Sequence, residues 1–107
     1  MPENFIFVKA DLAYYRVDLK DIYFIESQLN YVLIYTKDNI LKTLISMKEM
    51  EKRLPESNFV RIHNSCIVRI DKIAYIKFPR LIVQEKMKIL QISSTYKNEL
   101  FKRLRII

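Results

Sequence analysis

Residues 22–36 read IYFIESQLNYVLIYT, a stretch rich in β-branched and aromatic residues that is broken once at Gln28 to Asn30. Such side chains pack well on a pleated surface, so the stretch predicts two strands around a turn. In the second strand both alternating sets of side chains are mainly apolar, which predicts that this strand is well buried. Asp38 and Asn39 then tolerate left-handed turn geometry, so residues 40–44 are expected to return as a partner strand.

The next segment carries a helix start signal. Ser46-Met47-Lys48-Glu49 matches a capping box, in which the serine hydroxyl and the glutamate carboxylate each accept an unpaired backbone amide. Met47, Met50 and Leu54 follow at helical spacing, and Pro55 is expected to end the helix. This methionine stripe could line a ligand site, but core packing is the favoured interpretation.

The rest of the chain predicts strands and one closing helix. Strand-length apolar runs, separated by polar or proline-containing turns, lie at residues 59–62, 66–70, 73–76, 81–84 and 88–92. Tyr96, Leu100 and Leu104 then recur every four residues after the cap candidates Ser94 and Thr95. We therefore expect a mainly β protein with two short helices, at about 46–54 and 95–105, in a single domain spanning residues 1–107.

Charge is unevenly distributed along this chain of net charge +7. Residues 1–56 carry eight basic and nine acidic side chains, whereas residues 77–107 carry eight basic and two acidic ones. This asymmetry favours a polyanionic partner, because neutralising phosphates releases condensed counterions. Solubility alone is the alternative explanation.

Composition excludes several classes of function. The chain contains no glycine, so it can build neither a P-loop nor a dinucleotide-binding fingerprint. A single cysteine, Cys66, permits no intrachain disulfide and leaves a cysteine-based metal site without enough ligands, so neither a metal nor a cofactor is expected. No apolar run approaches the roughly 20 residues of a membrane-spanning helix, and no signal pattern opens the sequence. A soluble, cytoplasmic protein without a membrane partner is expected.

An enzyme is disfavoured by the residue inventory. His63 and Ser65 would share one face of a strand, and a distant acid could complete a hydrolytic triad. The sequence around them, however, does not resemble a nucleophile elbow. Cys66 lies in the apolar run SCIV and is expected to be a small buried hydrophobe instead of a reactive thiol.

A polar group interrupts the apolar stretch FVRIHNSCIVRIDKI at residues 59–73. Arg61, His63, Asn64 and Ser65 fall around an expected turn, where they could project together. A cation, an amide, an imidazole and a hydroxyl suit phosphates and base edges. A polar hairpin that satisfies its own backbone amides is an equally good interpretation on composition alone.

The same stretch closely resembles the central motif of LytTR domains. The resemblance extends over nearly the whole chain, in the order FIFVKAD, DLKDIYFIESQLNYVLIYT, SMKEMEKRLPESNF, the central motif and ISSTYKNELFKRL. It implies antiparallel sheets stacked in an elongated domain, whose loops enter the DNA major groove. It also implies the output domain of a bacterial two-component response regulator, preceded by a receiver domain and acting on promoter repeats as a homodimer.

The resemblance further implies roles for individual residues. Asn64 is expected to contact bases, with Asn30 and Tyr31 as a second base-contacting group. Phosphate contacts are expected from a larger set, namely His63, Ser65, Lys97, Lys86, Lys88 and Ser94. The family often has an arginine after a serine before the last helix, but here Ser93 is followed by Ser94 and Thr95, which puts a guanidinium contact to guanine in doubt. Arg69 stands where many members have asparagine.

Each of these roles has a structural alternative. Tyr31 also fits the buried alternation of its strand and could belong to the core. His63 could be hydrogen-bonded within the sheet. At the level of the whole chain, an RNA-binding module or a protein-interaction module would also be basic or rich in β-structure.

Overall fold

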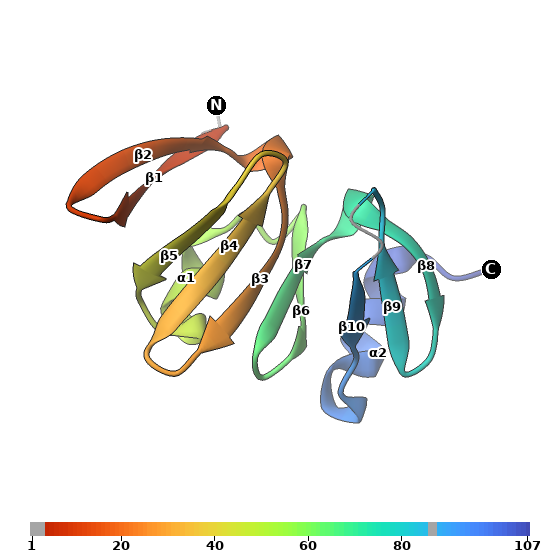
Figure 1. Ribbon diagram of the computed structural model, residues 1–107. Helices are drawn as coiled ribbons and strands as arrows, with labels where there is room; N and C mark the ends of the chain where they lie inside the picture. Colours follow the sequence, from red (N-terminus) through yellow and green to blue (C-terminus); the bar gives the residue numbers. More distant parts are fainter. Residues whose placement is uncertain (1–3, 86–87) are drawn as a thin grey trace.

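The computed structural model describes residues 4–85 and 88–107, and within them the fold is mainly β, as predicted. Ten strands form three antiparallel sheets, and two α-helices pack against them (Figure 1). The strands are β1 (Phe5–Ala10), β2 (Ala13–Asp18), β3 (Ile22–Gln28), β4 (Tyr31–Thr36), β5 (Ile40–Leu44), β6 (Phe59–His63), β7 (Cys66–Arg69), β8 (Ile73–Lys77), β9 (Arg80–Val83) and β10 (Ile89–Gln91). The helices are α1 (Met47–Arg53) and α2 (Ser94–Leu104).

The five-stranded sheet is the middle layer of the molecule and has the strand order β5-β4-β3-β7-β6. One core lies on the face covered by the β1–β2 hairpin and α1, and includes Ile25, Val32 and Met50. A second core lies between the opposite face and the β8–β10 sheet with α2, and includes Phe24, Val68 and Leu100. Apolar side chains on both faces of β3 and β7 are therefore required by this layering.

Strand β4 departs in part from its prediction. Val32 and Ile34 are fully buried, but Leu33 and Tyr35 on the other face are only half-buried. Tyr31 is 38% exposed at the start of the strand. The reason is that the second core reaches only the end of this face, where Tyr35 stacks on Phe24 with ring centroids 4.2 Å apart.

The β1–β2 hairpin was not predicted from turn signals. Its two-residue loop consists of Asp11 and Leu12, and both have positive φ, at 50° and 66°. Glycine or asparagine usually occupies such positions, because a Cβ atom makes left-handed backbone costly. An Asp-Leu pair gives no such signal, so the periodicity alone did not reveal the hairpin.

Both predicted helices form, with one correction to a cap. The Ser46 hydroxyl accepts a hydrogen bond from the Glu49 amide at 3.1 Å, which confirms the serine half of the capping box. Within residues 4–85 and 88–107 the Glu49 carboxylate accepts no hydrogen bond from the Ser46 amide. Met47, Met50 and Leu54 are buried in the first core, so the stripe is a packing surface. Helix α2 is capped by Ser93, not by Ser94 or Thr95, and its side chain accepts from the Thr95 amide.

The domain is elongated, with principal extents of 44 × 33 × 25 Å. Within the described residues, neither helix is long and apolar enough to span a membrane. Three turns and the start of α2 reach one end of the sheets, along the lower edge of Figure 1, and this end carries most of the residues considered next.

Candidate nucleic-acid interface

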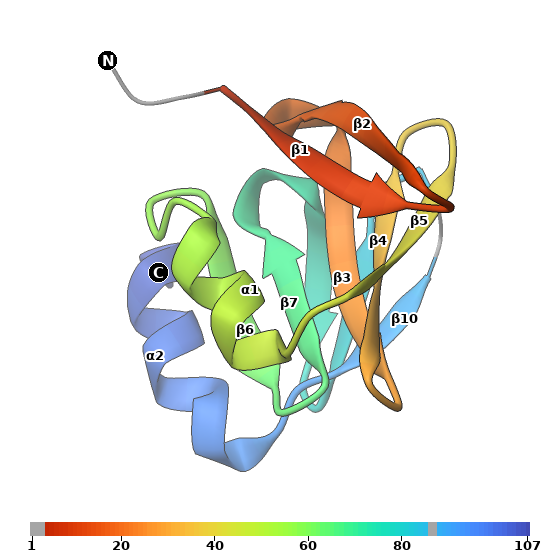
Figure 2. The ribbon, with the colours of Figure 1, turned by 90° about the vertical axis from the view of Figure 1, so that its left-hand side faces the viewer.

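The β3–β4 turn, the β6–β7 turn and the start of α2 lie together at one end of the molecule (Figures 1 and 2). Main-chain hydrogen bonds join them. The Ser27 amide donates to the Ser65 carbonyl at 2.9 Å, and the Ser93 amide donates to the Ile62 carbonyl at 2.8 Å. The chain thus brings together segments that are far apart in sequence, and main-chain bonds fix their relative positions without relying on side chains.

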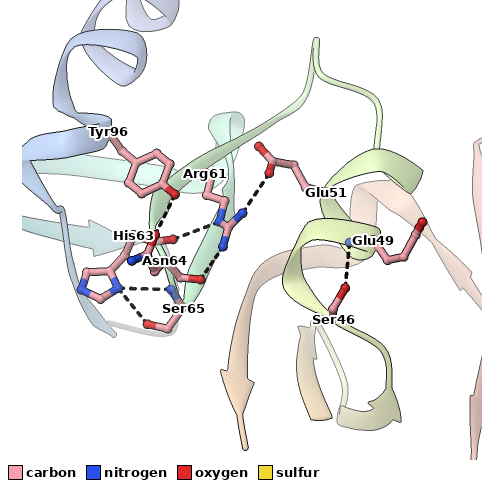
Figure 3. A network of polar contacts seen from close by, with 8 residues as sticks. All are labelled: Ser46, Glu49, Glu51, Arg61, His63, Asn64, Ser65 and Tyr96. Atoms are coloured by element: carbon pink, nitrogen blue, oxygen red, sulfur yellow. Dashed lines mark hydrogen bonds and ion pairs between the residues drawn. The ribbon is translucent and has the colours of Figure 1, made fainter. Parts of the chain in front are cut away.

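Asn64 lies at the tip of the β6–β7 turn and is exposed. Its side-chain oxygen accepts a hydrogen bond from the Tyr96 hydroxyl of α2 at 2.8 Å (Figure 3). A carbonyl oxygen has two lone pairs, so this oxygen can accept a second bond while the amide nitrogen donates one. The Asn64 amide is therefore held in one orientation with donor and acceptor capacity left for a ligand.

Arg61 folds back onto the same turn and does not project outward with its neighbours (Figure 3). Its guanidinium donates to the carbonyl of Asn64 at 2.6 Å and to that of His63 at 3.2 Å. A third bond, at 3.1 Å, goes to the Glu51 carboxylate of α1. The planar guanidinium thus fixes the backbone of the turn against α1, a function that suits its rigid donor geometry.

His63 and Ser65 pair with each other across the turn. The His63 Nδ1 atom accepts the Ser65 amide at 3.2 Å and lies 2.9 Å from the Ser65 hydroxyl. Because Nδ1 already accepts an amide, the ring carries its proton on Nε2, which points away from Ser65 in Figure 3. The pair is local turn structure, and among the described residues no hydrogen-bonded carboxylate completes a triad. The Nε2–H group remains a donor available to a ligand.

The β3–β4 turn presents the second predicted base-contacting group. Asn30 is exposed beside Leu29, which has a φ of 57° and is 96% exposed. The Tyr31 ring is partly exposed, and the Lys42 ammonium lies 4.6 Å from its centroid. Asn30 and Tyr31 therefore belong to the surface of this end, with a cation on the tyrosine ring.

At the start of α2, Ser94 is exposed and Lys97 is half-buried. The Lys97 ammonium lies 4.3 Å from the centroid of Phe78 and 5.4 Å from that of Phe101. Phe78 belongs to the β8–β9 turn, so Lys97 connects that turn to the helix. Ser94 and Lys97 thus reach the same end as Asn64, whose partner Tyr96 is the residue before Lys97.

Lys88 is not brought to this end. It lines a cavity with Asp38 and Asn39 of the β4–β5 turn and with Ile40 at the start of β5. Since strand β4 runs from the β3–β4 turn to the β4–β5 turn, Lys88 lies at the opposite end of the sheet from Asn30. Lys86 falls outside the described residues.

Other groups of the chain are structural. Arg69 donates to the Leu19 carbonyl at 2.7 Å and pairs with Asp71 at 2.8 Å, so it braces the backbone before β3. Burial, with a smaller effect from the Glu26 charge, raises the pKa of the buried Cys66 thiol to about 12, so the thiol stays protonated. The described residues contain no His, Cys, Asp and Glu cluster suited to a metal ion.

Two positioning residues were not predicted from the sequence. The sequence pattern places Tyr96 in the apolar stripe of α2 and predicts that Arg61 projects outward with its neighbours. A tyrosine in the first turn of a helix that packs beside a polar turn could have indicated this role. Its hydroxyl requires a hydrogen-bond partner, which the polar turn can supply. The inward direction of Arg61 depends on α1 supplying Glu51, which sequence spacing does not reveal.

Comparison with known families gives one match over most of the chain. The sequence model of the LytTr DNA-binding domain family matches residues 13–105. A solved LytTr DNA-binding domain, from a protein described as a methyl-accepting/DNA response regulator of Bacillus cereus, superimposes with a TM-score of 0.83. It covers 98% of this chain and 100% of the solved chain at 18% sequence identity, so it shows a common fold.

Two similar curated proteins carry the same name, sensory transduction protein LytT. The Bacillus subtilis protein is 34% identical over 95 residues, which cover 84% of this chain and 39% of the relative. The Bacillus anthracis protein is 33% identical over 95 residues, with corresponding coverages of 84% and 38%. The chain thus spans about two-fifths of the length of these relatives.

Proposed function

Because the chain belongs to the LytTR DNA-binding domain family, we propose that it binds duplex DNA sequence-specifically, by inserting the β3–β4 and β6–β7 turns into the major groove. Family membership itself establishes a non-catalytic DNA-binding domain of transcription regulation, with DNA as its partner. The RNA-binding and protein-interaction alternatives have no comparable support.

One observation carries the proposal: an exposed Asn64 whose amide is held by Tyr96 at 2.8 Å. An asparagine side chain can pair with adenine by accepting from one base nitrogen group and donating to another. Immobilising the amide before binding reduces the entropy lost on contact. Asn64 and the pair Asn30 and Tyr31 would contact base edges, because their turns lie at the same end of the molecule.

Phosphate contacts would fix the register of these turns on the duplex. His63 and Ser65 flank Asn64 in the chain, and Ser94 and Lys97 belong to the helix whose Tyr96 holds the Asn64 amide. These four residues would supply hydrogen-bond donors and one cation. We leave Lys88 outside this surface because it lies beside the β4–β5 turn at the opposite end.

The whole protein is a further part of the proposal. The LytT relatives are named sensory transduction proteins and are more than twice as long as this chain. We infer that residues 1–107 form a single output domain of a response regulator, that a receiver domain accompanies it, and that two copies bind repeated promoter elements.

The decisive test is a titration of the domain and its Asn64→Ala variant with two duplexes. One carries a site selected from random DNA, and the other has scrambled sequence. Asn64→Ala should weaken selected-site binding by about 1–3 kcal/mol, because a base-specific pair is lost, and should leave binding to scrambled DNA unchanged. Lys88→Ala is the control, and should affect neither duplex beyond the loss of one remote charge.

Equal weakening on both duplexes would contradict the base-contacting role of Asn64. The same titration measures stoichiometry: a duplex with two repeats should bind two domains, and saturation at one would argue against pairing. Failure of the unsubstituted domain to enrich any sequence would overturn the proposed specificity.

A further inference from the structure

The β8–β9 turn lies beside the candidate interface and adds a fourth segment to it. In Figure 1 it lies at the same lower edge as the β6–β7 turn and the start of α2. The Ile92 amide donates to the Pro79 carbonyl at 2.7 Å, which ties the turn to the segment leading into α2. Phe78 also packs edge-on against Phe101, with centroids 6.4 Å apart, and lies under the Lys97 ammonium. The turn is therefore fixed next to the proposed base-contacting surface.

Two cations flank this turn directly opposite each other. Lys77 at the end of β8 and Arg80 at the start of β9 are cross-strand partners, and both are exposed. Opposed side chains of an antiparallel pair have Cβ atoms about 4.5–5.5 Å apart, so the two project from the same face. Neither side chain has an ion-pair or hydrogen-bond partner within residues 4–85 and 88–107.

This pair lowers stability in the free protein. Like charges placed directly opposite each other repel. No acidic residue occurs in the sequence between Asp71 and Glu85 to offset them. Lys77 and Arg80 flank Phe78 and Pro79 in the chain, and Lys97 lies over the Phe78 ring. None of these three cations has an ion pair among the described residues.

We propose that the β8–β9 turn is a separate DNA contact, in which Lys77 and Arg80 bind backbone phosphates beside the groove occupied by the other turns. Phosphates on a duplex supply closely spaced negative charge that would convert this repulsion into attraction. The contact is independent of sequence, since phosphates carry no base information. The inference rests on the proposed DNA-binding function. It adds the β8–β9 turn, which lies outside the proposed base-contacting residues, to the surface that binds the DNA backbone.

The test compares a Lys77→Ala/Arg80→Ala double variant with the unsubstituted domain at several salt concentrations. The probes are the selected-site duplex and the scrambled duplex. The slope of log affinity against log salt should become shallower by about 1.8, because roughly 0.9 is lost for each phosphate contact. Affinity for both duplexes should fall by the same factor, so their ratio should stay constant.

The matched control is Lys20→Ala/Lys88→Ala, which removes the same charge from exposed positions at the opposite end. An equal change of slope in this control would overturn the proposal, because the effect would then come from net charge. An unchanged slope in Lys77→Ala/Arg80→Ala would also overturn it. The two proposals can fail separately. If Asn64→Ala loses specificity but Lys77→Ala/Arg80→Ala keeps the salt slope of the unsubstituted domain, the proposed function stands and only the β8–β9 contact is refuted.

Melting temperature distinguishes binding from folding. Removing Lys77 and Arg80 removes a repulsion, so the double variant should melt at the same temperature as the unsubstituted domain or higher at low salt. A lower melting temperature would show that the two side chains stabilise the turn. It would count against the proposal that they have no structural role in the free protein and serve to bind DNA.

Discussion

At the scale of single residues, the candidate interface contains two kinds of side chain: those proposed to contact DNA, and those that hold the first kind in position. Asn64 is exposed, whereas its neighbours Arg61 and Tyr96 use their polar groups on the turn itself. Arg61 fixes the backbone of the turn, and Tyr96 fixes the Asn64 amide. We therefore expect that a defect in binding can also arise at residues outside the proposed contacts with the duplex.

Tyr96→Phe should test this separation. The substitution removes only the hydroxyl that orients the Asn64 amide, a neutral hydrogen bond of about 0.5–1.5 kcal/mol. Preference for the selected site over scrambled DNA should fall by about twofold to tenfold, with no change in the salt slope. Duplex titrations at two salt concentrations measure both quantities. Tyr75→Phe, which alters an exposed tyrosine of β8, is the control and should preserve the preference. An unaltered preference in Tyr96→Phe would show that Asn64 orients itself without help.

At the scale of secondary-structure elements, sequence was sufficient wherever a pattern had a single interpretation. The composition of residues 22–36 predicted β3, β4 and the turn between them, and the capping box predicted the start of α1. Ser93, Ser94 and Thr95 can all cap a helix, so the residues alone could not select Ser93. The β1–β2 hairpin escaped prediction because Asp11 and Leu12 adopt positive φ without glycine.

The candidate site could be predicted only in part from the sequence. The residues of the β3–β4 and β6–β7 turns were identified by their resemblance to a family motif, and the fold brings these turns together. Lys88 is close in sequence to the last helix but lies at the far end, since β10 runs the length of its small sheet. The Arg61 side chain turns inward because α1 places Glu51 beside it. This ion pair is a tertiary contact, which sequence spacing does not reveal.

The cap of α1 provides a prediction at this scale. Ser46→Ala should lower the free energy of unfolding by about 1 kcal/mol, because the Glu49 amide loses its acceptor. Urea denaturation measures the change. Ser46→Asn retains a side-chain oxygen and should recover most of the loss. If alanine and asparagine were equally stable at this position, the Ser46 hydroxyl would have no capping role.

At the scale of the whole molecule, one sheet supports a core on each face, and Tyr23 connects two of the layers. This buried tyrosine of β3 donates a hydrogen bond of 2.6 Å to Glu85, which follows β9. The bond to Glu85, and secondarily burial and the charge of Glu85, raise the pKa of Tyr23 from 10.0 to about 12. The five-stranded sheet and the small sheet are therefore joined by a polar contact as well as by apolar packing.

Stability should consequently fall with pH in the alkaline range. Between pH 10 and about pH 12, the unfolded chain has released the Tyr23 proton while the folded chain retains it. Unfolding then releases a proton, so the free energy of unfolding decreases as pH rises. Urea denaturation from pH 9 to pH 11.5 should show a shallower decline for Tyr23→Phe than for the unsubstituted domain.

The difference between the two curves is the relevant quantity, because the raised pKa of Cys66 contributes an alkaline decline to both proteins. Tyr14→Phe, at an exposed tyrosine, should reproduce the unsubstituted curve. Parallel curves for Tyr23→Phe and the unsubstituted domain would contradict the coupling of Tyr23 ionisation to folding.

The bonds from Ser27 to Ser65 and from Ser93 to Ile62 use only amides and carbonyls, which nearly every amino acid possesses. The framework of the binding end is therefore insensitive to which side chains occupy the tips of its turns. If Asn30 and Asn64 contact bases as proposed, exchanging either one should alter the preferred operator while the scaffold stays intact. Regulators built on this domain would then diverge toward new promoters through single substitutions, without any remodelling of the chain between them.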